Sequence, residues 1–474
     1  DPNRLKTPLK RTATGWKSIG WEEALDEAAT RLLDIKKRYG ANAIGAYLGN
    51  PSVHNLGTLL NMPGLLKTIR SQNTFSATSA DQLPHYVAAW AMFGHPLLLP
   101  VPDFARTHCM LILGGNPLAS NGSMMTAPGV GNYLKSIRQR GGKVIVVDPR
   151  RTETAEHADE HLFIQPATDV FLLLALLQVL FEEKRTNPQR RRGDKPLPLA
   201  GWDALAAAVQ PFTPEKVAAR TRIAPKRIWA LAHTLSDAPN AVVYGRMGLS
   251  VQRYGGLCQW LIHCLNIATG NFDAPGGAMF PQPAADPLVG AKPRNILGRW
   301  RSRVRNLPEF MGELPVSALA EEMLTPGEGQ IRAFVTNAGN PVLSTPNGTQ
   351  LEKALEGLEF MVSIDIYLNE TTRHAHLILP PATGLETAHY DLTFNFLSVR
   401  NTAKYSPPTL PKDPEARYDY EILQALTHRL SESAEPFEAV TPEAMLDTAL
   451  QFGPYRLTLA QLQAQPEGID LGEL

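Results

Sequence analysis

Two stretches of the chain place the same polar residue types at the same spacing after an aspartate. One reads DPRRTETAEHADE from Asp148, and the other reads DIYLNETTRHAH from Asp365. Counted from each aspartate, a Glu, a Thr and a His recur at the same positions, as Glu153, Thr154 and His157 and as Glu370, Thr371 and His374. A Pro-Ala-Thr triplet closes each copy, at 166–168 and 381–383. Agreement in this order indicates an internal duplication.

Each aspartate is also preceded by a Gly-Asn-Pro turn. The turns read Gly114-Gly115-Asn116-Pro117 and Ala338-Gly339-Asn340-Pro341. In an open parallel sheet, ligands bind at the carboxyl ends of the strands, where glycine lets a ligand approach the backbone and helix N-termini face anions. An aspartate there can accept hydrogen bonds from a ribose diol or from N1 and N2 of guanine. Each copy therefore predicts one nucleotide site. The structural alternative is that the turn only reverses the chain and the aspartate caps a helix.

The elements that must position these residues alternate between strands and helices. Continuous apolar runs predict strands that are covered on both faces, at 109–113, 143–148, 241–245, 332–336 and 360–365. Residues 21–40 predict an amphipathic helix, with acids in its first turn and a glycine at its end. The alternation predicts an α/β fold with largely parallel sheets.

Composition excludes several classes of protein. The 474 residues include 46 Lys plus Arg and 46 Asp plus Glu, so no net field favours nucleic acid. No apolar run is long enough to span a membrane. Cys109, Cys258 and Cys264 lack C-x-x-C spacing and are expected to be buried, and the run Arg190 to Arg192 favours a solvated loop. Neither a G-x-G-x-x-G fingerprint nor a P-loop follows a predicted strand, which argues against a simple dehydrogenase or a P-loop enzyme.

These stretches resemble a known family, the molybdenum and tungsten oxidoreductases of the dimethyl sulfoxide reductase type. VVDPRRTETAEHADEHLFIQPATD resembles the family's first dinucleotide segment, and residues 337–383, from NAGNP to the second PAT, resemble its second. YGRMGLSVQRYGGLCQWLIHCLNIATGNFDAPGG, residues 244–277, resembles the central segment. DPNRLKTPLKR with GWEEALDEAA resembles the stretch that follows the family's N-terminal iron–sulfur domain. The resemblance covers nearly the whole chain, in the family's order.

The resemblance implies a bis-molybdopterin guanine dinucleotide cofactor that carries molybdenum or tungsten. It assigns three groups of cofactor-binding residues: Gly114, Asn116, Pro117, Asp148, Arg150, Thr152, Pro166 and Asp169 for one dinucleotide; Gly339, Asn340, Pro341, Asp365, Glu370, Thr371 and His376 for the other; Gly245 and Met247 in the central segment. Gln252 is assigned to the active-site funnel, as a catalytic residue.

The resemblance also locates the side chain that ligates the metal, in the loop at 72–95. Alignment places Asp81 at the ligand position, followed by Gln82, and ADQLP resembles the Asp-bearing loop of respiratory nitrate reductases. A carboxylate oxygen suits an oxophilic, high-valent metal. Asp81 and Gln82 are therefore the predicted catalytic pair, with Ser76 and Ser79 as fallback ligands. Formate dehydrogenases have Cys or selenocysteine followed by His at this point, which argues against formate oxidation.

The activity implied is two-electron oxygen-atom or hydride transfer on a small-molecule substrate. Electrons would pass to a partner subunit or domain through a 4Fe–4S iron–sulfur cluster in an N-terminal segment outside this chain. A C-terminal cofactor-covering domain would also lie outside it, so the fragment could be empty of cofactor. We expect no nucleic-acid partner, no direct membrane insertion, and a cytoplasmic rather than periplasmic location.

Two other classes of function stay open. A non-catalytic electron-transfer or scaffold subunit could keep the fold without the metal, as in the large iron–sulfur subunit of respiratory complex I. A nucleotide-binding module without a redox role is the other. For the architecture we expect two Rossmann-like domains related by a pseudo-twofold. Residues 1–80 with 326–474 would form a discontinuous domain carrying the second dinucleotide segment, and 81–325 an inserted domain carrying the first.

Overall fold

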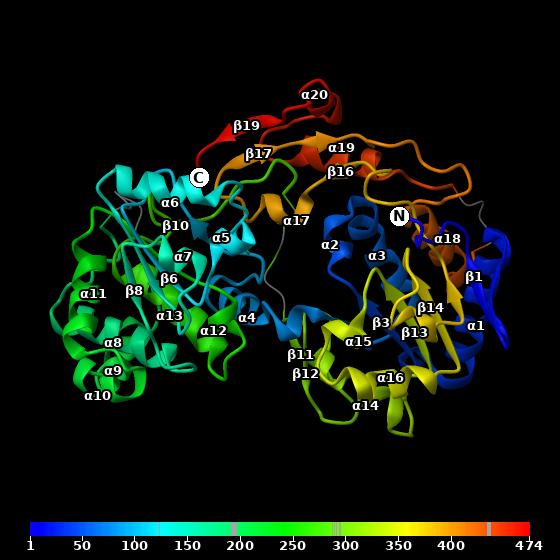
Figure 1. The fold of residues 1–474 in the computed structure, drawn as a ribbon, viewed down its shortest axis with the longest axis horizontal. Helices are drawn as coiled ribbons and strands as arrows, with labels where there is room; N and C mark the ends of the chain where they lie inside the picture. Colours follow the sequence, from blue (N-terminus) through cyan, green and yellow to red (C-terminus); the bar gives the residue numbers. More distant parts are fainter. Residues whose placement is uncertain are drawn as a thin grey trace. The chain divides into compact units, whose positions relative to one another are not determined.

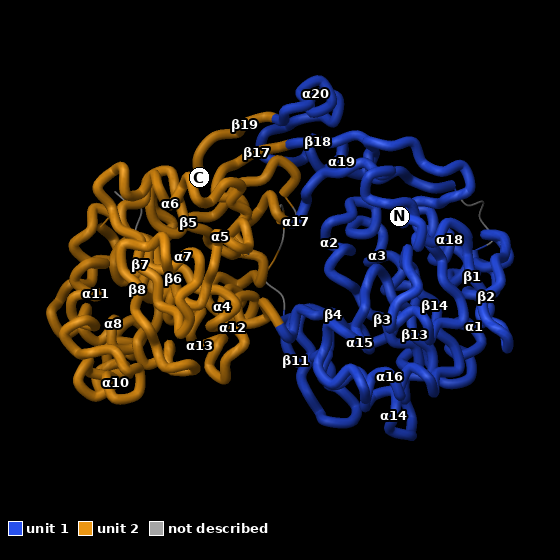
Figure 2. The backbone as a smooth tube through the Cα atoms, in the orientation of Figure 1, with its two compact units in different colours: residues 1–80, 294–393, 404–468 blue, residues 81–293, 394–403, 469–474 orange. Residues whose placement is uncertain are grey.

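The chain divides into two compact units. The computed structural model describes residues 1–474 except 123, 191–196, 287, 289, 291, 293–294 and 434–437, so Arg191 and Arg192 of the arginine run lie outside the described residues. Unit 1 comprises residues 1–80, 294–393 and 404–468, and unit 2 comprises 81–293, 394–403 and 469–474 (Figures 1 and 2).

The division differs from the expected domains after residue 293. The hairpin of β11 (Leu297–Arg301) and β12 (Pro308–Phe310) belongs to unit 1 rather than to the inserted domain. The Trp300 indole donates to the Gln72 carbonyl at 3.1 Å, and Leu314 N–H donates to the Thr74 carbonyl at 2.9 Å. Two C-terminal stretches belong to unit 2, and they pair with each other through β17 (Asn401–Ala403) and β19 (Ile469–Gly472). The bridge between Thr126 and Ser398 and the bond from Arg106 to the Leu474 carbonyl hold them to the rest of the unit. A single sequence does not show that the chain returns to unit 2 at its C-terminal end, since this depends on contacts between short segments that are far apart in the sequence.

Unit 2 is built on a four-stranded parallel sheet of order β8-β7-β6-β9. The four strands are β6 (Cys109–Leu113), β7 (Lys143–Val147), β8 (Glu160–Leu162) and β9 (Ala241–Gly245). Its helices are α4 (Leu83–Phe93), α5 (Pro117–Ser120), α6 (Val130–Gln139), α7 (Glu153–Glu156), α8 (Asp169–Glu182), α9 (Trp202–Val209), α10 (Pro214–Thr221), α11 (Pro225–Asp237), α12 (Met247–Ser250) and α13 (Gly255–Ala268). A small antiparallel pair joins β5 (Val101–Pro102) to β10 (Ala278–Met279).

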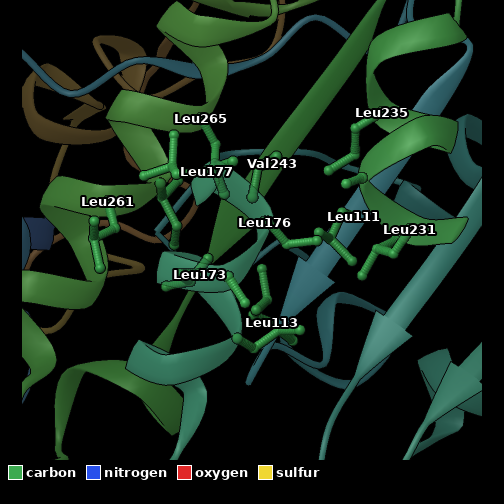
Figure 3. Close-up of a cluster of buried hydrophobic side chains, with 14 of the residues drawn as sticks. Leu111, Leu113, Leu173, Leu176, Leu177, Leu231, Leu235, Val243, Leu261 and Leu265 are labelled. Atoms are coloured by element: carbon green, nitrogen blue, oxygen red, sulfur yellow. The ribbon is translucent and has the colours of Figure 1, made fainter. Parts of the chain in front are cut away.

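Both faces of this sheet are covered, which explains why its strands are apolar throughout. Alternate strand residues such as Leu111 and Leu113 face α8, α11 and α13, and Figure 3 shows the leucines of these helices gathered against them. The intervening residues, such as Met110 and Ile112, pack instead with Val130 and Leu134 of α6. The helix α8 is apolar on nearly all sides because it is buried between sheet and neighbouring helices.

Unit 1 is built on a seven-stranded sheet of order β2-β1-β15-β14-β13-β3-β4. Its strands are β1 (Leu9–Thr12), β2 (Gly15–Ser18), β3 (Ile44–Leu48), β4 (Thr74–Ser76), β13 (Ala333–Asn337), β14 (Phe360–Ile364) and β15 (Leu377–Ile378). The strands from β15 to β4 run parallel, and β1 and β2 extend the β15 edge antiparallel. A further pair joins β16 (His389–Tyr390) to β18 (Tyr405–Ser406).

Helices cover both faces of the unit 1 sheet. On one face α1, α3 and α18 pack on residues such as Ile44 and Val335, and on the other α14 and α16 pack on Phe334 and Met361. The helices are α1 (Trp21–Tyr39), α2 (Pro51–His54), α3 (Leu56–Ile69), α14 (Leu319–Leu324), α15 (Pro341–Ser344), α16 (Gly348–Glu356), α18 (Asp419–Leu430), α19 (Pro442–Phe452) and α20 (Leu459–Gln463), with α17 (Leu392–Asn395) spanning the boundary between the unit ranges. Short 3-10 turns lie at 41–43, 77–80, 316–318 and 372–374.

The two sheets share an ordered set of four parallel strands. β9, β6, β7 and β8 of unit 2 stand in the same order as β3, β13, β14 and β15 of unit 1. The α/β class with largely parallel sheets is therefore as expected. No helix among the described residues has the length and apolarity that a bilayer crossing requires.

Candidate functional site

The first Gly-Asn-Pro turn leads from β6 into α5. Gly114 adopts a left-handed φ of 55°, and a Cβ there would lie 2.8 Å from the Cα of Gly248. Asn116 is held from two sides. Its amide Nδ2 donates to Glu153 at 2.6 Å, and its Oδ1 accepts from the Thr154 hydroxyl at 2.8 Å. The repeated Glu and Thr thus fix the asparagine of the turn.

The second turn, between β13 and α15, has the same contacts. The Asn340 amide donates to Glu370 at 2.7 Å, and its Oδ1 accepts from the Thr371 hydroxyl at 2.7 Å. Ala338 takes the place of Gly114 and keeps a left-handed φ of 47°. Hydrogen bonds from Asn340 and from its own backbone amide lower the pKa of Glu370. Its own backbone amide and Asn116 likewise lower the pKa of Glu153. The duplication is one of side-chain geometry as well as of sequence.

The two strand-end aspartates lie at the carboxyl ends of β7 and β14. Asp148 accepts from the Arg150 amide at 2.8 Å, and Asp365 accepts from the Tyr367 amide at 3.0 Å. Each aspartate therefore shapes its own loop by bonding to the backbone two residues on. Burial raises the pKa of Asp365. In each aspartate this bond uses Oδ1. The Oδ2 of Asp365 also accepts a long hydrogen bond from the Asn369 side-chain amide, at 3.4 Å.

A cavity of about 720 Å³ lies over the carboxyl ends of the unit 1 strands. It is lined by the turn residues Gly339 and Asn340, by Asp365, and by Pro381 and Thr383 of the second Pro-Ala-Thr triplet. Residues of the segment after β3, between Gly49 and Asn55, and the buried Asp419 also line it. The volume lies within the range of pockets that hold small molecules and cofactors.

Gly49 and Gly339 make the close approach of two strand ends possible. A Cβ on Gly49 would lie 1.7 Å from the Ala338 carbonyl oxygen, and a Cβ on Gly339 would lie 2.6 Å from the Tyr47 ring. Only glycine fits at these positions because the obstacles are backbone and a fully buried ring.

Each unit also holds a buried acid at the first residue of a helix. Asp169 begins α8 and accepts from the Gln252 amide at 2.8 Å. Asp419 begins α18 and accepts from the Asn55 amide at 3.0 Å. Burial raises the pKa of both carboxyls, to about 6 for Asp419. Gln252 follows β9, which lies beside β6, and Asn55 follows β3, which lies beside β13. The two acid–amide pairs therefore occupy equivalent positions in the two units.

The predicted metal ligand, Asp81, lies just before α4. Its Oδ1 accepts from the Arg246 guanidinium at 3.0 Å, and Oδ2 makes no hydrogen bond with the described residues. Gln82 instead donates to the Tyr86 hydroxyl at 2.6 Å. The fallback serines are engaged elsewhere in unit 1. Ser76 donates to Glu313 at 2.6 Å, and Ser79 accepts from the Val316 amide at 2.9 Å.

The central segment lies against the start of α4. The carbonyl of Gly245 and the hydroxyl of Ser250 contact the two ring nitrogens of His85, at 3.1 and 3.2 Å. Burial lowers the pKa of His85 to about 3, so its ring is neutral. Because a carbonyl only accepts, Nε2 carries the proton and Nδ1 accepts from Ser250. Met247 is partly exposed on α12.

Several predicted residues have local structural roles. Thr152 caps α7 by accepting from the Ala155 amide at 3.1 Å, and Arg150 and Pro166 are exposed. Pro117 and Pro341 begin α5 and α15. His376 does not line the cavity, because its Nδ1 accepts from the Met361 amide at 3.1 Å beside β14 and β15. Burial lowers its pKa to about 4.

The three cysteines are buried, as expected. Burial raises the pKa of each thiol to about 12, so none is a thiolate at neutral pH. Within the described part of the chain, no three His, Cys, Asp or Glu side chains group so that they could hold a metal ion.

Comparison with known proteins identifies the family. The model of the molybdopterin oxidoreductase family matches residues 4–429, which is most of the chain. The chain belongs to this family. Membership implies a molybdopterin cofactor carrying molybdenum or tungsten, and the family includes oxidoreductases that act on several different substrates.

Two curated relatives and one solved structure are similar to this chain. The molybdopterin-containing subunit of thiosulfate reductase from Salmonella typhimurium is 26% identical over 418 residues, covering 81% of this chain and 52% of the relative. Formate dehydrogenase H from Escherichia coli is 26% identical over 404 residues, covering 80% and 54%. Acetylene hydratase from Pelobacter acetylenicus shares the fold, with a TM-score of 0.77, 22% identity, and coverage of 98% of this chain and 66% of that chain. The chain spans about half the length of the two curated relatives.

Sequence reasoning missed Asp419, Asn55, Gly49 and His85. Asn55 and Gly49 carry no local signal, because the residues in the same positions of unit 2 are Gln252 and Arg246, which differ in type. Asp419 matches Asp169 in type but lies much farther from its Pro-Ala-Thr triplet. Asn50 illustrates the problem. It stands in a third Gly-Asn-Pro, at 49–51, yet its backbone is α-helical, with φ −56° and ψ −38°, whereas Asn116 has φ −128° and ψ 68° and Asn340 has φ −117° and ψ 67°.

Proposed function

We propose that this chain is the cofactor-binding body of a molybdenum or tungsten oxidoreductase that holds two molybdopterin guanine dinucleotides. The observation that carries the proposal is the duplicated turn, in which Glu and Thr fix the same asparagine over the carboxyl end of a parallel sheet in each unit. A duplicated cradle supports two like ligands, and a pseudo-twofold relation between the units would follow from that duplication.

The residues of unit 1 fit the guanine end of such a cofactor. The cavity offers carboxylates at Asp365 and Asp419, which accept N–H donors, beside a turn whose glycine lets a ligand reach the backbone. In unit 2 the matching acceptors are Asp148 and Asp169. Asn116 and Asn340 would be oriented before the ligand arrives, which lowers the entropy cost of binding.

The whole protein would carry out two-electron oxygen-atom or hydride transfer on a small substrate. When bound, the metal and its pterins supply the redox chemistry. Asp81 would provide the protein ligand to the metal through a carboxylate oxygen. Gln252, by its bond to Asp169, would join the central segment to the first dinucleotide site. The electron partner, the iron–sulfur cluster and the cytoplasmic location stay predictions that concern the full-length protein.

The test is metal and guanine-nucleotide content of the full-length protein, purified anaerobically. We expect two guanine nucleotides per metal atom, and loss of nucleotide in Asn116→Ala and in Asn340→Ala. Asn132→Ala, on the exposed side of α6, is the control and should keep the full content. Absence of both metal and nucleotide from the wild type would favour a scaffold subunit. Nucleotide without metal would favour a module with no redox role.

A further inference from the structure

Arg246 is the first residue after β9, and it is nearly buried. Its side chain is 9% exposed, whereas that of its partner Asp81 is 37% exposed. A guanidinium that has lost most of its water is strongly directed toward an available carboxylate. The bond between them joins two stretches that are far apart in sequence and that both lie in unit 2.

A second contact fixes the same two stretches. His85, four residues after Asp81, is buried and uses both ring nitrogens on the central segment, through the Gly245 carbonyl and the Ser250 hydroxyl. The Gln259 amide lies 3.5 Å from the same hydroxyl. The neutral ring donates from Nε2 to the Gly245 carbonyl and accepts at Nδ1 from the Ser250 hydroxyl. The start of α4 is therefore clamped onto the residues on both sides of Arg246.

The two contacts leave the Asp81 carboxylate with little freedom. Its Oδ1 is occupied by Arg246, and only Oδ2 is left without a hydrogen bond to the described residues. A bidentate carboxylate ligand would need both oxygens and would have to break the ion pair. A ligand that uses Oδ2 alone would keep it.

We propose that Arg246 is a positioning residue that makes Asp81 a one-oxygen ligand, by holding Oδ1 and presenting Oδ2. This inference rests on the proposed function, in which Asp81 binds the metal. Arg246 touches neither metal nor substrate in this role. It sets the orientation of the carboxylate and offsets part of its charge, while His85 anchors the segment that carries Asp81.

The test uses full-length protein with Arg246→Gln, Arg246→Lys, Asp81→Ala and the double variant Asp81→Ala/Arg246→Gln. The readouts are metal content, the number of metal–oxygen bonds from X-ray absorption, and the electron paramagnetic resonance spectrum of the pentavalent metal. The matched control is Arg253→Gln, at an exposed arginine of the same segment.

We expect Arg246→Gln to keep the metal and to shift the resonance spectrum or gain a metal–oxygen bond. Arg246→Lys should lie closer to the wild type, because it keeps the charge but not the planar fork. In the Asp81→Ala background, Arg246→Gln should add no further shift, since Arg246 acts through Asp81.

Other outcomes separate the two proposals. If the wild type binds metal and Arg246→Gln has an unchanged spectrum, or shifts it equally with and without Asp81, the role of Arg246 is overturned while the proposed function stands. A metal-free wild type overturns both. If Arg246→Gln does not fold, Arg246→Lys decides by the same comparison with its Asp81→Ala double variant.

Discussion

Asp419 is a carboxyl group whose charge is disfavoured by its surroundings. It is buried at the start of α18, and its hydrogen bond from Asn55 offsets only part of the lost hydration. Burial raises its pKa from 3.8 to about 6. The folded chain therefore binds a proton that the unfolded chain releases between about pH 4 and pH 6, and the stability of unit 1 falls as pH rises through this window.

Asp419→Asn should remove that pH dependence. An uncharged amide has no ionisation to disfavour, so the variant should be more stable than the wild type at pH 8 by about 3 kcal/mol, the equivalent of two pKa units, and should lose this advantage near pH 4. Urea unfolding midpoints at both pH values measure the difference. Asp413→Asn, at a half-buried aspartate nearby, serves as control. Equal gains at the two pH values would contradict the assignment.

The turn that follows each strand is where unit 1 and unit 2 are most alike. β13 and β3 end side by side, and the chain leaves them through Ala338 and Gly49, which lie almost in contact. In unit 2, β6 and β9 end in the same way, with Gly248 against Gly114. In each unit, these close contacts bring two loops from separate parts of the chain together at the carboxyl ends of the strands.

Gly49→Ala should therefore destabilise unit 1 strongly. The new methyl would lie 1.7 Å from the Ala338 carbonyl oxygen, so the strand ends would have to separate, at a cost of roughly 3 kcal/mol or more. Gly64→Ala, within α3, meets no atom within 4 Å and should stabilise the helix by about 0.5–1 kcal/mol. Thermal unfolding of the two variants checks the contrast. An unchanged unfolding temperature in Gly49→Ala would mean that the contact between Gly49 and Ala338 is not tightly packed.

The positions of the strands can be predicted from the sequence better than the strands with which they pair. The predicted strands at 109–113 and 241–245 match β6 and β9 residue for residue, because strands buried on both faces are apolar throughout. The pairing of β3 with β13 and the role of Asp419 were not predictable. Residues 384–418 separate Asp419 from the triplet at 381–383, whereas Asp169 follows its triplet directly. An insertion of that length hides a correspondence that depends only on position in space.

The whole molecule consists of two units that each have their own buried clusters and their own candidate nucleotide site. Unit 1 is stabilised by clusters on the two faces of its sheet, and unit 2 by two others. A ligand that binds one folded unit stabilises that unit by mass action, by about 2.7 kcal/mol at one hundred times its dissociation constant.

Guanosine diphosphate should accordingly protect each unit through its own aspartate. With the nucleotide present, amide hydrogen exchange should slow in β13 and β14 and also in β6 and β7. Asp365→Ala should abolish the effect in unit 1 only, and Asp148→Ala in unit 2 only. Hydrogen exchange followed by mass spectrometry resolves these peptides. A loss of protection in both units from either substitution would contradict two separate sites.

The order of segments along the chain has a consequence for synthesis on the ribosome. Unit 2 draws most of its residues from one continuous stretch, 81–293, and can fold when that stretch has emerged. β3 ends at residue 48, and its neighbour β13 begins only at residue 333. At 5–20 residues per second, β3 waits on the order of 15–60 s for its partner. During that interval its β13-facing edge is an unpaired strand edge that a chaperone would have to shield.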